Sequence, residues 1–329
     1  MIVLSEIRFF YMKYNVMMAS DANYLPYVEI TLKSLLMHNE NLSVFILHTG
    51  DISESWQNDL QPYFAKRYST LQLVHIDKSE LDSFSANNYI TSATYLRFYI
   101  HRLLHYSDIP YWIYLDCDIV INGNITLPFE YLDFSRHTIA AVLDPYVTRI
   151  GHPYKDKDYF NAGVLYFNME KYQSINQSIN QSINQSINQQ SINQSINQSI
   201  NQSINQSINQ SINQSSFSAK LITLHNQLKE SLIYGDQDIL NYYFKDRWIS
   251  LDKRYNFQLD HMISINTLDV SPVIFHFTGP HKPLDNIFSE NTYVNAVISL
   301  FRLYASISWQ DIYSLPLGTI RANWINQER

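Results

Sequence analysis

The chain has 329 residues, 46% of them apolar, so it is long enough for one large domain with a sizeable core or for two smaller domains. Its formal net charge of −7 argues against a nucleic-acid partner, because nucleic-acid binding needs a basic face. The single cysteine, Cys117, excludes a disulfide framework within the chain and fits a reducing cytosol.

The first residues predict neither a membrane-spanning helix nor a secretory leader. Glu6, Arg8 and Lys13 interrupt the apolar residues, and no basic residues precede them as they do in a signal peptide. Met12 stands just before the first predicted strand and reads as a natural start. We therefore expect residues 1–13 to be an N-terminal extension that an over-extended gene start would add.

Apolar runs alternate with amphipathic segments through the next part of the chain. The elements predicted there are strands at 15–19, 43–47 and 71–76 and helices at 25–38, 54–61 and 94–104. Ser53 is the predicted cap of the second helix and Pro62 its stop. Arg97 is either a solvent-facing residue or a cation at the ligand-binding edge. The alternation predicts an α/β fold with a parallel sheet covered by helices on both faces.

The stretch 111–122 begins as an apolar and aromatic run, typical of a strand buried on both faces, and then meets Asp116 and Asp118. Ligands of open α/β sheets bind outside the carboxyl ends of the strands, where these two carboxylates are expected. Two acidic oxygens there suit a hard divalent ion, although an Asp-x-Asp pair alone is a weak signal. Cys117 should point to the other face as a buried apolar residue.

Two further strands are predicted before the middle of the chain. The first, at 139–143, ends in Asp144, and the second, at 159–168, contains Asn161-Ala162-Gly163. With only seven glycines in the chain, Gly163 indicates a close approach of the backbone to another group. The sequence has no Gly-rich phosphate loop, so a metal and side chains would have to hold any phosphate.

Residues 174–214 repeat Ser-Ile-Asn-Gln ten times, with one extra residue, Gln190. A period of four drifts by about 40° per repeat on a helix, so the isoleucines spiral around its surface. On a strand, Ile and Gln share one face, and neither face makes a good core. The composition predicts a flexible or weakly helical surface insert, and loop closure over such a length is tolerated.

The repeat also predicts a feature of the gene. The codons CAA-TCA-ATC-AAT encode Gln-Ser-Ile-Asn and together form three copies of the tetranucleotide CAAT. We infer that the gene contains a CAAT tract, in which slippage by one unit would shift the reading frame. Expression would then switch on and off stochastically, which is phase variation.

Beyond the repeat, the predicted elements are helices at 217–228 and 237–244, a strand and loop at 248–256 and a short strand at 273–277. Asp236 is either the N-cap of the second helix or a functional residue. His276 is either a third metal ligand or a structural histidine, and Lys282 is either a phosphate contact or a solvated lysine. From 287 the chain reads as helical to Ser308 and then irregular, a tail that packs on the domain or contacts a membrane.

Six motifs occur in an order that is specific as a set. They are Ala19-Ser20-Asp21-Ala22-Asn23-Tyr24, Thr94-Tyr95-Leu96-Arg97, Tyr114-Leu115-Asp116-Cys117-Asp118, Phe160-Asn161-Ala162-Gly163, Asp236-Gln237-Asp238 and His276-Phe277-Thr278-Gly279-Pro280-His281-Lys282-Pro283. The set resembles the family 8 glycosyltransferases, in particular the bacterial lipooligosaccharide and lipopolysaccharide galactosyl- and glucosyltransferases. The likeness covers about 14–283 without the repeat.

The resemblance implies a GT-A fold, a UDP-hexose donor, Mn²⁺ with Mg²⁺ as a substitute, and retention of anomeric configuration. It assigns metal binding to Asp116, Asp118 and His276, and nucleotide binding to Ala19, Asp21, Asn23, Tyr24, Gly279 and Lys282. It assigns the donor sugar to Arg97, Asn161, Ala162, Asp236 and Gln237, of which Asp236 and Gln237 are the catalytic candidates. The catalytic domain would span 14–283 around the insert 174–214, with a C-terminal helical tail over 284–329.

We therefore expect a cytoplasmic enzyme, either free or held peripherally at the inner face of the cytoplasmic membrane, that transfers galactose rather than glucose to lipooligosaccharide core. The rival hypotheses are a glucosyltransferase of the same family, a non-catalytic UDP-sugar-binding protein, and a hydrolase of the donor. Tyr89 and Leu284 depart from residues common in the family, which leaves the acceptor open. Because the amide of Gln237 is a poor nucleophile, we favour attack on the face from which UDP leaves.

Overall fold

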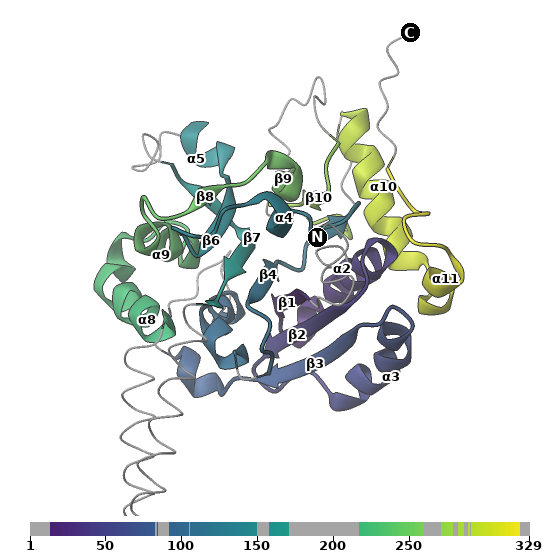
Figure 1. The fold of residues 1–329 in the computed structure, drawn as a ribbon, viewed down its shortest axis with the longest axis horizontal. Coiled ribbons are helices and arrows are strands. Elements are labelled where there is room, and N and C mark those ends of the chain that lie inside the picture. The colour runs from purple at the N-terminus through teal and green to yellow at the C-terminus, as the bar shows by residue number, and fades with distance from the viewer. Residues whose placement is uncertain are drawn as a thin grey trace, which may run out of the picture.

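A mixed sheet lies at the centre of the structure, with helices packed around it (Figure 1). The computed structural model describes residues 14–82, 84, 92–104, 106–149, 158–170, 217–259, 271–278, 282–285, 289 and 291–322. The predicted N-terminal extension, the Ser-Ile-Asn-Gln repeat, Tyr89 and Gly279 lie outside these residues.

The described part of this sheet has seven strands in the spatial order β3-β2-β1-β4-β7-β6-β8. Their bounds are β1 Tyr14–Ala19, β2 Leu42–His48, β3 Thr70–His75, β4 Tyr111–Leu115, β6 Ile139–Leu143, β7 Phe160–Asn168 and β8 Ile249–Ser250. Neighbouring strands are parallel except at β7, which runs antiparallel to both β4 and β6. The prediction of a mostly parallel sheet is confirmed, and the direction of β7 was not predicted.

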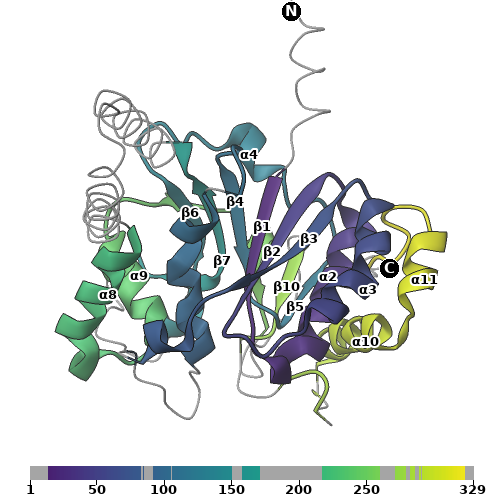
Figure 2. The same ribbon diagram turned by 90° about the horizontal axis from the view of Figure 1, so that it is seen from below.

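Helices cover both faces of the sheet, as the alternating pattern predicted (Figure 2). The longer ones are α2 Leu25–His38, α3 Glu54–Ala65, α8 Phe217–Leu228, α9 Asp236–Tyr243 and the 3₁₀ segment η3 Ser92–Leu103. Side chains alternate along β1, so Val16 and Met18 pack with α2 and α3, whereas Met17 packs with η3, α8 and α9. The apolar run of β1 therefore reflects burial on two sides.

A second, smaller sheet brings the C-terminal part of the chain to the end of β4. It consists of β5 Ile119–Ile121, β10 Ile274–His276 and β9 Phe257–Gln258, in the order β5-β10-β9. Strand β10 is antiparallel to β5, and His276 stands opposite Ile119. Because β5 begins directly after Asp118, this pairing places His276 beside the Asp-x-Asp segment.

Polar side chains buried in α2 hold the segment that leads into β5. The hydroxyl of Thr31 lies 2.6 Å from the carbonyl oxygen of Cys117 and 2.9 Å from that of Ile119. One turn later, the hydroxyl of Ser34 accepts a hydrogen bond of 3.0 Å from the backbone N–H of Ile121. These bonds satisfy backbone groups that would otherwise be buried without partners, and they fix the path of the chain beside the two aspartates.

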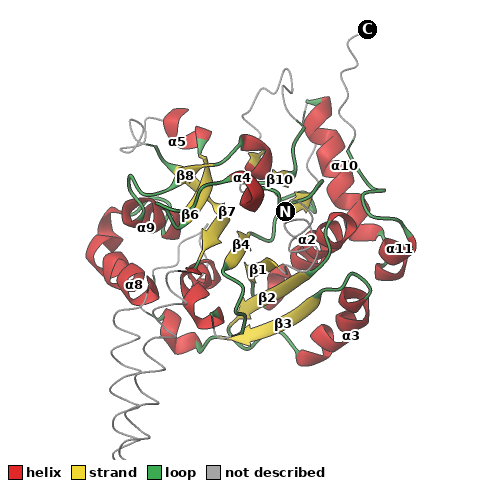
Figure 3. Cartoon of the chain, viewed as in Figure 1, coloured by secondary structure: helices red, strands yellow, loops and turns green. Residues whose placement is uncertain are grey.

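The C-terminal part packs on the domain through two helices, α10 Thr292–Ser306 and α11 Trp309–Ser314 (Figure 3). Phe301 and Tyr304 of α10 are fully buried with Met37 of α2, and Lys33 donates a hydrogen bond of 2.8 Å to the carbonyl of Ile307. The prediction of irregular chain after Ser308 was wrong, because α11 forms there. Within the described residues, no helix has the length and apolar character needed to cross a bilayer.

Two other local predictions were wrong. Pro62 lies inside α3, which continues to Ala65, because Phe64 is fully buried and packing holds the last turn despite the missing N–H. The helix expected over 94–104 is a 3₁₀ segment interrupted at Tyr99. The remaining short helices are α4 Pro128–Tyr131, α5 Pro145–Arg149, η1 Ala22–Tyr24, η2 Lys78–Leu81, η4 Lys229–Ser231 and η5 Lys253–Asn256.

Candidate active site

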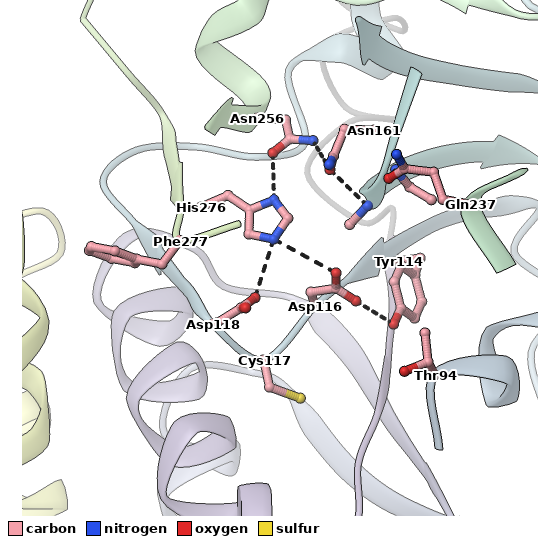
Figure 4. Close-up of polar contacts among 12 residues, drawn as sticks. Thr94, Tyr114, Asp116, Cys117, Asp118, Asn161, Gln237, Asn256, His276 and Phe277 are labelled. Carbon is pink, nitrogen blue, oxygen red and sulfur yellow. Dashed lines mark hydrogen bonds and ion pairs between the residues drawn. The ribbon is translucent and has the colours of Figure 1, made fainter. Parts of the chain in front are cut away.

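The structure brings together the three residues predicted to bind metal. Asp116, Asp118 and His276 each offer a ligand atom, and these atoms lie within 4.8 Å of one another. Nε2 of His276 is 3.2 Å from Oδ1 of Asp118 and 3.7 Å from Oδ2 of Asp116 (Figure 4). The two aspartates follow β4 and the histidine ends β10, so two separate sheets position the cluster.

The donor set fits a divalent cation. Two carboxylates and one imidazole leave coordination positions for phosphate oxygens or water. Oδ1 of Asp118 is buried and accepts no hydrogen bond from any described residue, although it faces the His276 ring. An acceptor atom buried in this way is costly unless a proton or a metal compensates it.

Lys282 adds a fixed positive charge to this cluster. Its ammonium lies 2.6 Å from Oδ2 of Asp118 and donates a hydrogen bond of 2.7 Å to the carbonyl of Phe277. Burial by itself raises the pKa of Asp118, but Lys282 and His276 reverse this effect and hold that pKa below its usual range. Asp118 is therefore ionised at neutral pH, which a metal ligand requires.

Arg97 links the Asp-x-Asp segment to α9. Its guanidinium pairs with Oδ1 of Asp116 and Oδ2 of Asp236, both at 2.9 Å, and donates to the carbonyl of Ala162 at 2.7 Å. The same group lies 4.6 Å from the ring centre of Tyr114. Only 7% of Arg97 is exposed, so the solvent-facing interpretation was wrong and the cation belongs to the site edge.

Asp236 is the first residue of α9, and the prediction that it caps this helix was wrong. Gly235 occupies the N-cap with φ of 53°, a conformation that glycine adopts without strain. The Asp236 carboxylate turns to Arg97 instead. Burial raises the pKa of Asp236 to about 7, although Arg97 opposes this shift.

Both ends of the Gln237 amide are engaged by protein groups. Its oxygen accepts a hydrogen bond of 3.0 Å from the N–H of Ala162, and its nitrogen donates one of 3.0 Å to Oδ2 of Asp144. Asn161 contacts the same Asp144 oxygen at 3.4 Å. Asp144 was not among the predicted site residues, although it ends a buried strand just as Asp116 does, and that signal could have found it.

The backbone of Gly163 comes close to the cluster, as the scarcity of glycine in the sequence predicted. A Cβ atom at this position would lie 2.1 Å from Cε1 of His276 and 2.6 Å from Oδ2 of Asp116. The carbonyl of Gly163 also accepts a 2.8 Å hydrogen bond from the N–H of Asp116. Only a residue without a side chain fits between these groups.

The loop after β1 lies at the same edge of the sheet. Oδ1 of Asp21 accepts hydrogen bonds from the N–H groups of Asn23 (2.9 Å) and Tyr24 (3.2 Å), which shapes the turn η1. Tyr24 is 38% exposed. Burial raises its pKa, Lys282 lowers it and Asp118 raises it, so the charges of Lys282 and Asp118 reach this ring.

The side chain of Cys117 points away from Asp116, Asp118 and His276, as strand alternation predicted (Figure 4). Its thiol lies 3.2 Å from the carbonyl of Ala19 on β1. Burial raises the pKa of the thiol well above its ordinary value, and the neighbouring aspartates add to the shift. Cys117 is therefore a packing residue, with little of the thiolate character that a nucleophile or a metal ligand needs.

The model of the Glycosyl transferase family 8 matches residues 15–210 and 184–287 of this chain. The chain belongs to glycosyl transferase family 8. An uncharacterized protein of Haemophilus influenzae is 36% identical over 302 residues, which are 92% of this chain and 94% of that protein. The glycosyltransferase GlyF of Streptococcus pneumoniae is 29% identical over 92% of this chain, but the match spans only 63% of GlyF.

Other relatives of this family 8 chain include the lipopolysaccharide 1,3-galactosyltransferase of Salmonella typhimurium, 26% identical over 82% of this chain and 73% of that enzyme. Among solved structures, the galactosyltransferase LgtC, in complex with donor and acceptor sugar analogues, has a TM-score of 0.66 at 20% identity and covers 91% of this chain and 99% of its own. GlyE of Streptococcus pneumoniae has a TM-score of 0.62 at 24% identity, over 92% of this chain and 62% of its own. The GT-A fold expected from the sequence is confirmed.

Gly163→Ala should abolish divalent-metal binding, because the new methyl group would displace His276 and Asp116. Calorimetric titration with Mn²⁺ measures this loss directly. Gly123→Ala is the matched control, since its Cβ would meet Val273 no closer than 3.4 Å, an ordinary contact. Unchanged Mn²⁺ binding by Gly163→Ala would show that the cluster does not hold the metal.

Proposed function

We propose that this family 8 glycosyltransferase is a metal-dependent retaining enzyme that transfers a hexose from UDP to lipooligosaccharide core, with galactose favoured over glucose. The observation that supports this proposal is the convergence of Asp116, Asp118 and His276 beside Lys282. This cluster lies where a parallel sheet binds ligands, at the carboxyl ends of β1 and β4.

In the proposed reaction, Asp116, Asp118 and His276 hold Mn²⁺, or Mg²⁺ as a substitute. The bound ion would supply Lewis-acid stabilisation of the negative charge on the departing UDP. Lys282 pairs its ammonium with Oδ2 of Asp118 and would contact the diphosphate together with Gly279. Because Lys282 is tied to the carbonyl of Phe277, its charge is already oriented before the donor arrives, which favours the transition state.

The proposed donor site extends from the cluster in two directions. Towards η1, the exposed ring of Tyr24 would stack on uracil, and Ala19, Asp21 and Asn23 would hold the nucleoside. Towards α9, the sugar would contact a group of residues that the guanidinium of Arg97 and the amide of Gln237 hold in place. This group consists of Arg97, Asn161, Ala162, Asp236 and Gln237.

Retention of configuration is proposed to proceed by attack on the face from which UDP leaves. The oxygen of Gln237 already accepts the N–H of Ala162, and its nitrogen is held by Asp144. An amide fixed in this way positions the sugar and polarises its hydroxyl groups, but it lacks the freedom and the charge of a covalent nucleophile. A phosphate oxygen of the leaving UDP would take the proton from the acceptor.

The relatives of the chain support a proposal for the acceptor and for the location of the enzyme. A lipopolysaccharide galactosyltransferase is among them, so we propose a lipid A–core acceptor and a site of action in the cytoplasm, peripheral to the inner membrane face. Leu284 is 40% exposed close to Lys282 in the sequence, and it belongs to the region where acceptor specificity would be set.

Phase variation is proposed from the repeat and is tested at the gene. We expect the codons of 174–214 to form an uninterrupted CAAT tract, with repeat number differing among single-colony isolates. Isolates whose tract changes by one unit should lose the protein on immunoblots, and isolates that change by three units should keep it. Mixed synonymous codons in place of CAAT would contradict the proposal.

The purified protein should transfer galactose from UDP-galactose to truncated lipooligosaccharide in the presence of Mn²⁺. EDTA should abolish transfer, and Asp118→Asn should reduce it by about tenfold or more, because a neutral amide replaces a charged carboxylate ligand. Asp59→Asn, an exposed aspartate on α3, is the control and should leave the rate unchanged. Transfer that persists in EDTA would overturn the metal assignment. Faster transfer from UDP-glucose than from UDP-galactose would overturn the assignment of galactose as the donor sugar. Hydrolysis of the donor without transfer would mark a hydrolase, and binding without turnover a UDP-sugar-binding protein.

Gln237→Ala should slow transfer by about 10²- to 10³-fold without abolishing it, as the loss of one preorganised polar group does. Steady-state kinetics with UDP-galactose measures the effect, and Gln310→Ala on the surface of α11 is the control. Complete loss of transfer with normal UDP binding would instead assign Gln237 a covalent or obligatory role.

A further inference from the structure

A row of buried amides connects the backbone of β7 to the imidazole of His276. Asn161 on β7 is 7% exposed, and Asn256, just before β9, is 1% exposed. Nδ2 of Asn256 lies 2.9 Å from Oδ1 of Asn161, and Oδ1 of Asn256 lies 2.9 Å from Nδ1 of His276 (Figure 4). The pairing of β9 with β10, in which Gln258 stands opposite His276, brings Asn256 to this position.

The direction of every hydrogen bond in this row follows from its first member. The backbone N–H of Gly163 can only donate, and it donates to Oδ1 of Asn161 at 3.0 Å. The Asn256 atom that faces the same oxygen must therefore be the NH₂ group. The carbonyl oxygen of Asn256 is then turned towards His276, where it can only accept.

The row thereby determines which nitrogen of His276 carries the proton. Since Oδ1 of Asn256 is an acceptor, Nδ1 of His276 must be the N–H donor to it. In the neutral ring this leaves the lone pair on Nε2, the nitrogen that faces Asp118 and Asp116. A metal ligand needs this arrangement, and its second nitrogen is ordinarily held by such an outer partner.

We infer that Asn256 is a positioning residue that holds His276 in the Nδ1–H tautomer and so keeps Nε2 available to a divalent cation. This inference rests on the proposed metal site. Without the Asn256 carbonyl, the ring can place its proton on Nε2 and donate it to Oδ1 of Asp118, 3.2 Å away. That hydrogen bond would occupy two of the three metal ligands at once.

The test compares Asn256→Ala and Asn256→Asp with Asn39→Ala. Asn39 is another buried asparagine, 5% exposed, whose amide bonds the backbone at Leu35 and Ile125, away from the cluster. Asn256→Asp keeps an acceptor for Nδ1–H while it loses the NH₂ group. Mn²⁺ affinity is measured from the electron paramagnetic resonance of free Mn²⁺. The tautomer is measured in metal-free protein from the ¹⁵N shifts of the His276 ring, assigned by their absence in His276→Gln.

Wild type should show the Nδ1–H tautomer, and Asn256→Ala should shift it towards Nε2–H and weaken Mn²⁺ binding by about 10- to 100-fold. Asn256→Asp should retain the Nδ1–H tautomer and bind Mn²⁺ more tightly than Asn256→Ala, and Asn39→Ala should match wild type in both measurements. An Nε2–H tautomer in wild type would overturn the inference without any variant. If Asn256→Ala bound Mn²⁺ as tightly as wild type does, the inference about Asn256 would be overturned and the proposed function would stand. If wild type bound no Mn²⁺, the proposed function would be overturned as well.

Discussion

The accumulation of negative charge at the end of β4 is the constraint on which the site depends. Asp116, Asp118 and Asp236 gather there with side chains that are 25%, 14% and 5% exposed. Partly buried carboxylates without partners would repel one another and lose hydration. Arg97 bridges Asp116 and Asp236, and Lys282 pairs with Asp118. Because these cations come from η3 and from the chain after β10, charge balance requires the sheet, η3, α9 and β10 to assemble together.

The sequence predicted the strands and most helices because burial imposes a local pattern. Alternation along β1 and the periodicity of α2 are visible in single segments, and their bounds agree with the structure within about two residues. Three features depended on distant contacts and were missed. Strand β7 has the same apolar pattern in either direction, Pro62 is overridden by the burial of Phe64, and the carboxylate of Asp236 prefers Arg97 to the helix end.

The proposed metal ligands could be predicted from the sequence, but the hydrogen bonds that connect the site could not. Asp116, Asp118 and His276 were found from a strand end and from motif order, and the structure places them together. Asp144 and Asn256 were missed for different reasons. Asp144 carried a usable signal, a carboxylate that ends a buried strand. Asn256 carried none, because its importance lies in a contact with Asn161, 95 residues away in the chain.

Because β10 follows the repeat in the chain, changes by whole repeats and frameshifts would affect the protein differently. Strand β7 ends before the repeat and α8 begins after it, and each is anchored in the core by its own contacts. A gain or loss of whole repeats would therefore leave β7 and α8 with their own core contacts. A frameshift is different, because α2 would lose its cover from α10 and β5 its partner β10. The truncated product would expose apolar surface and be degraded, so it would not persist as a competitor for nucleotide sugar.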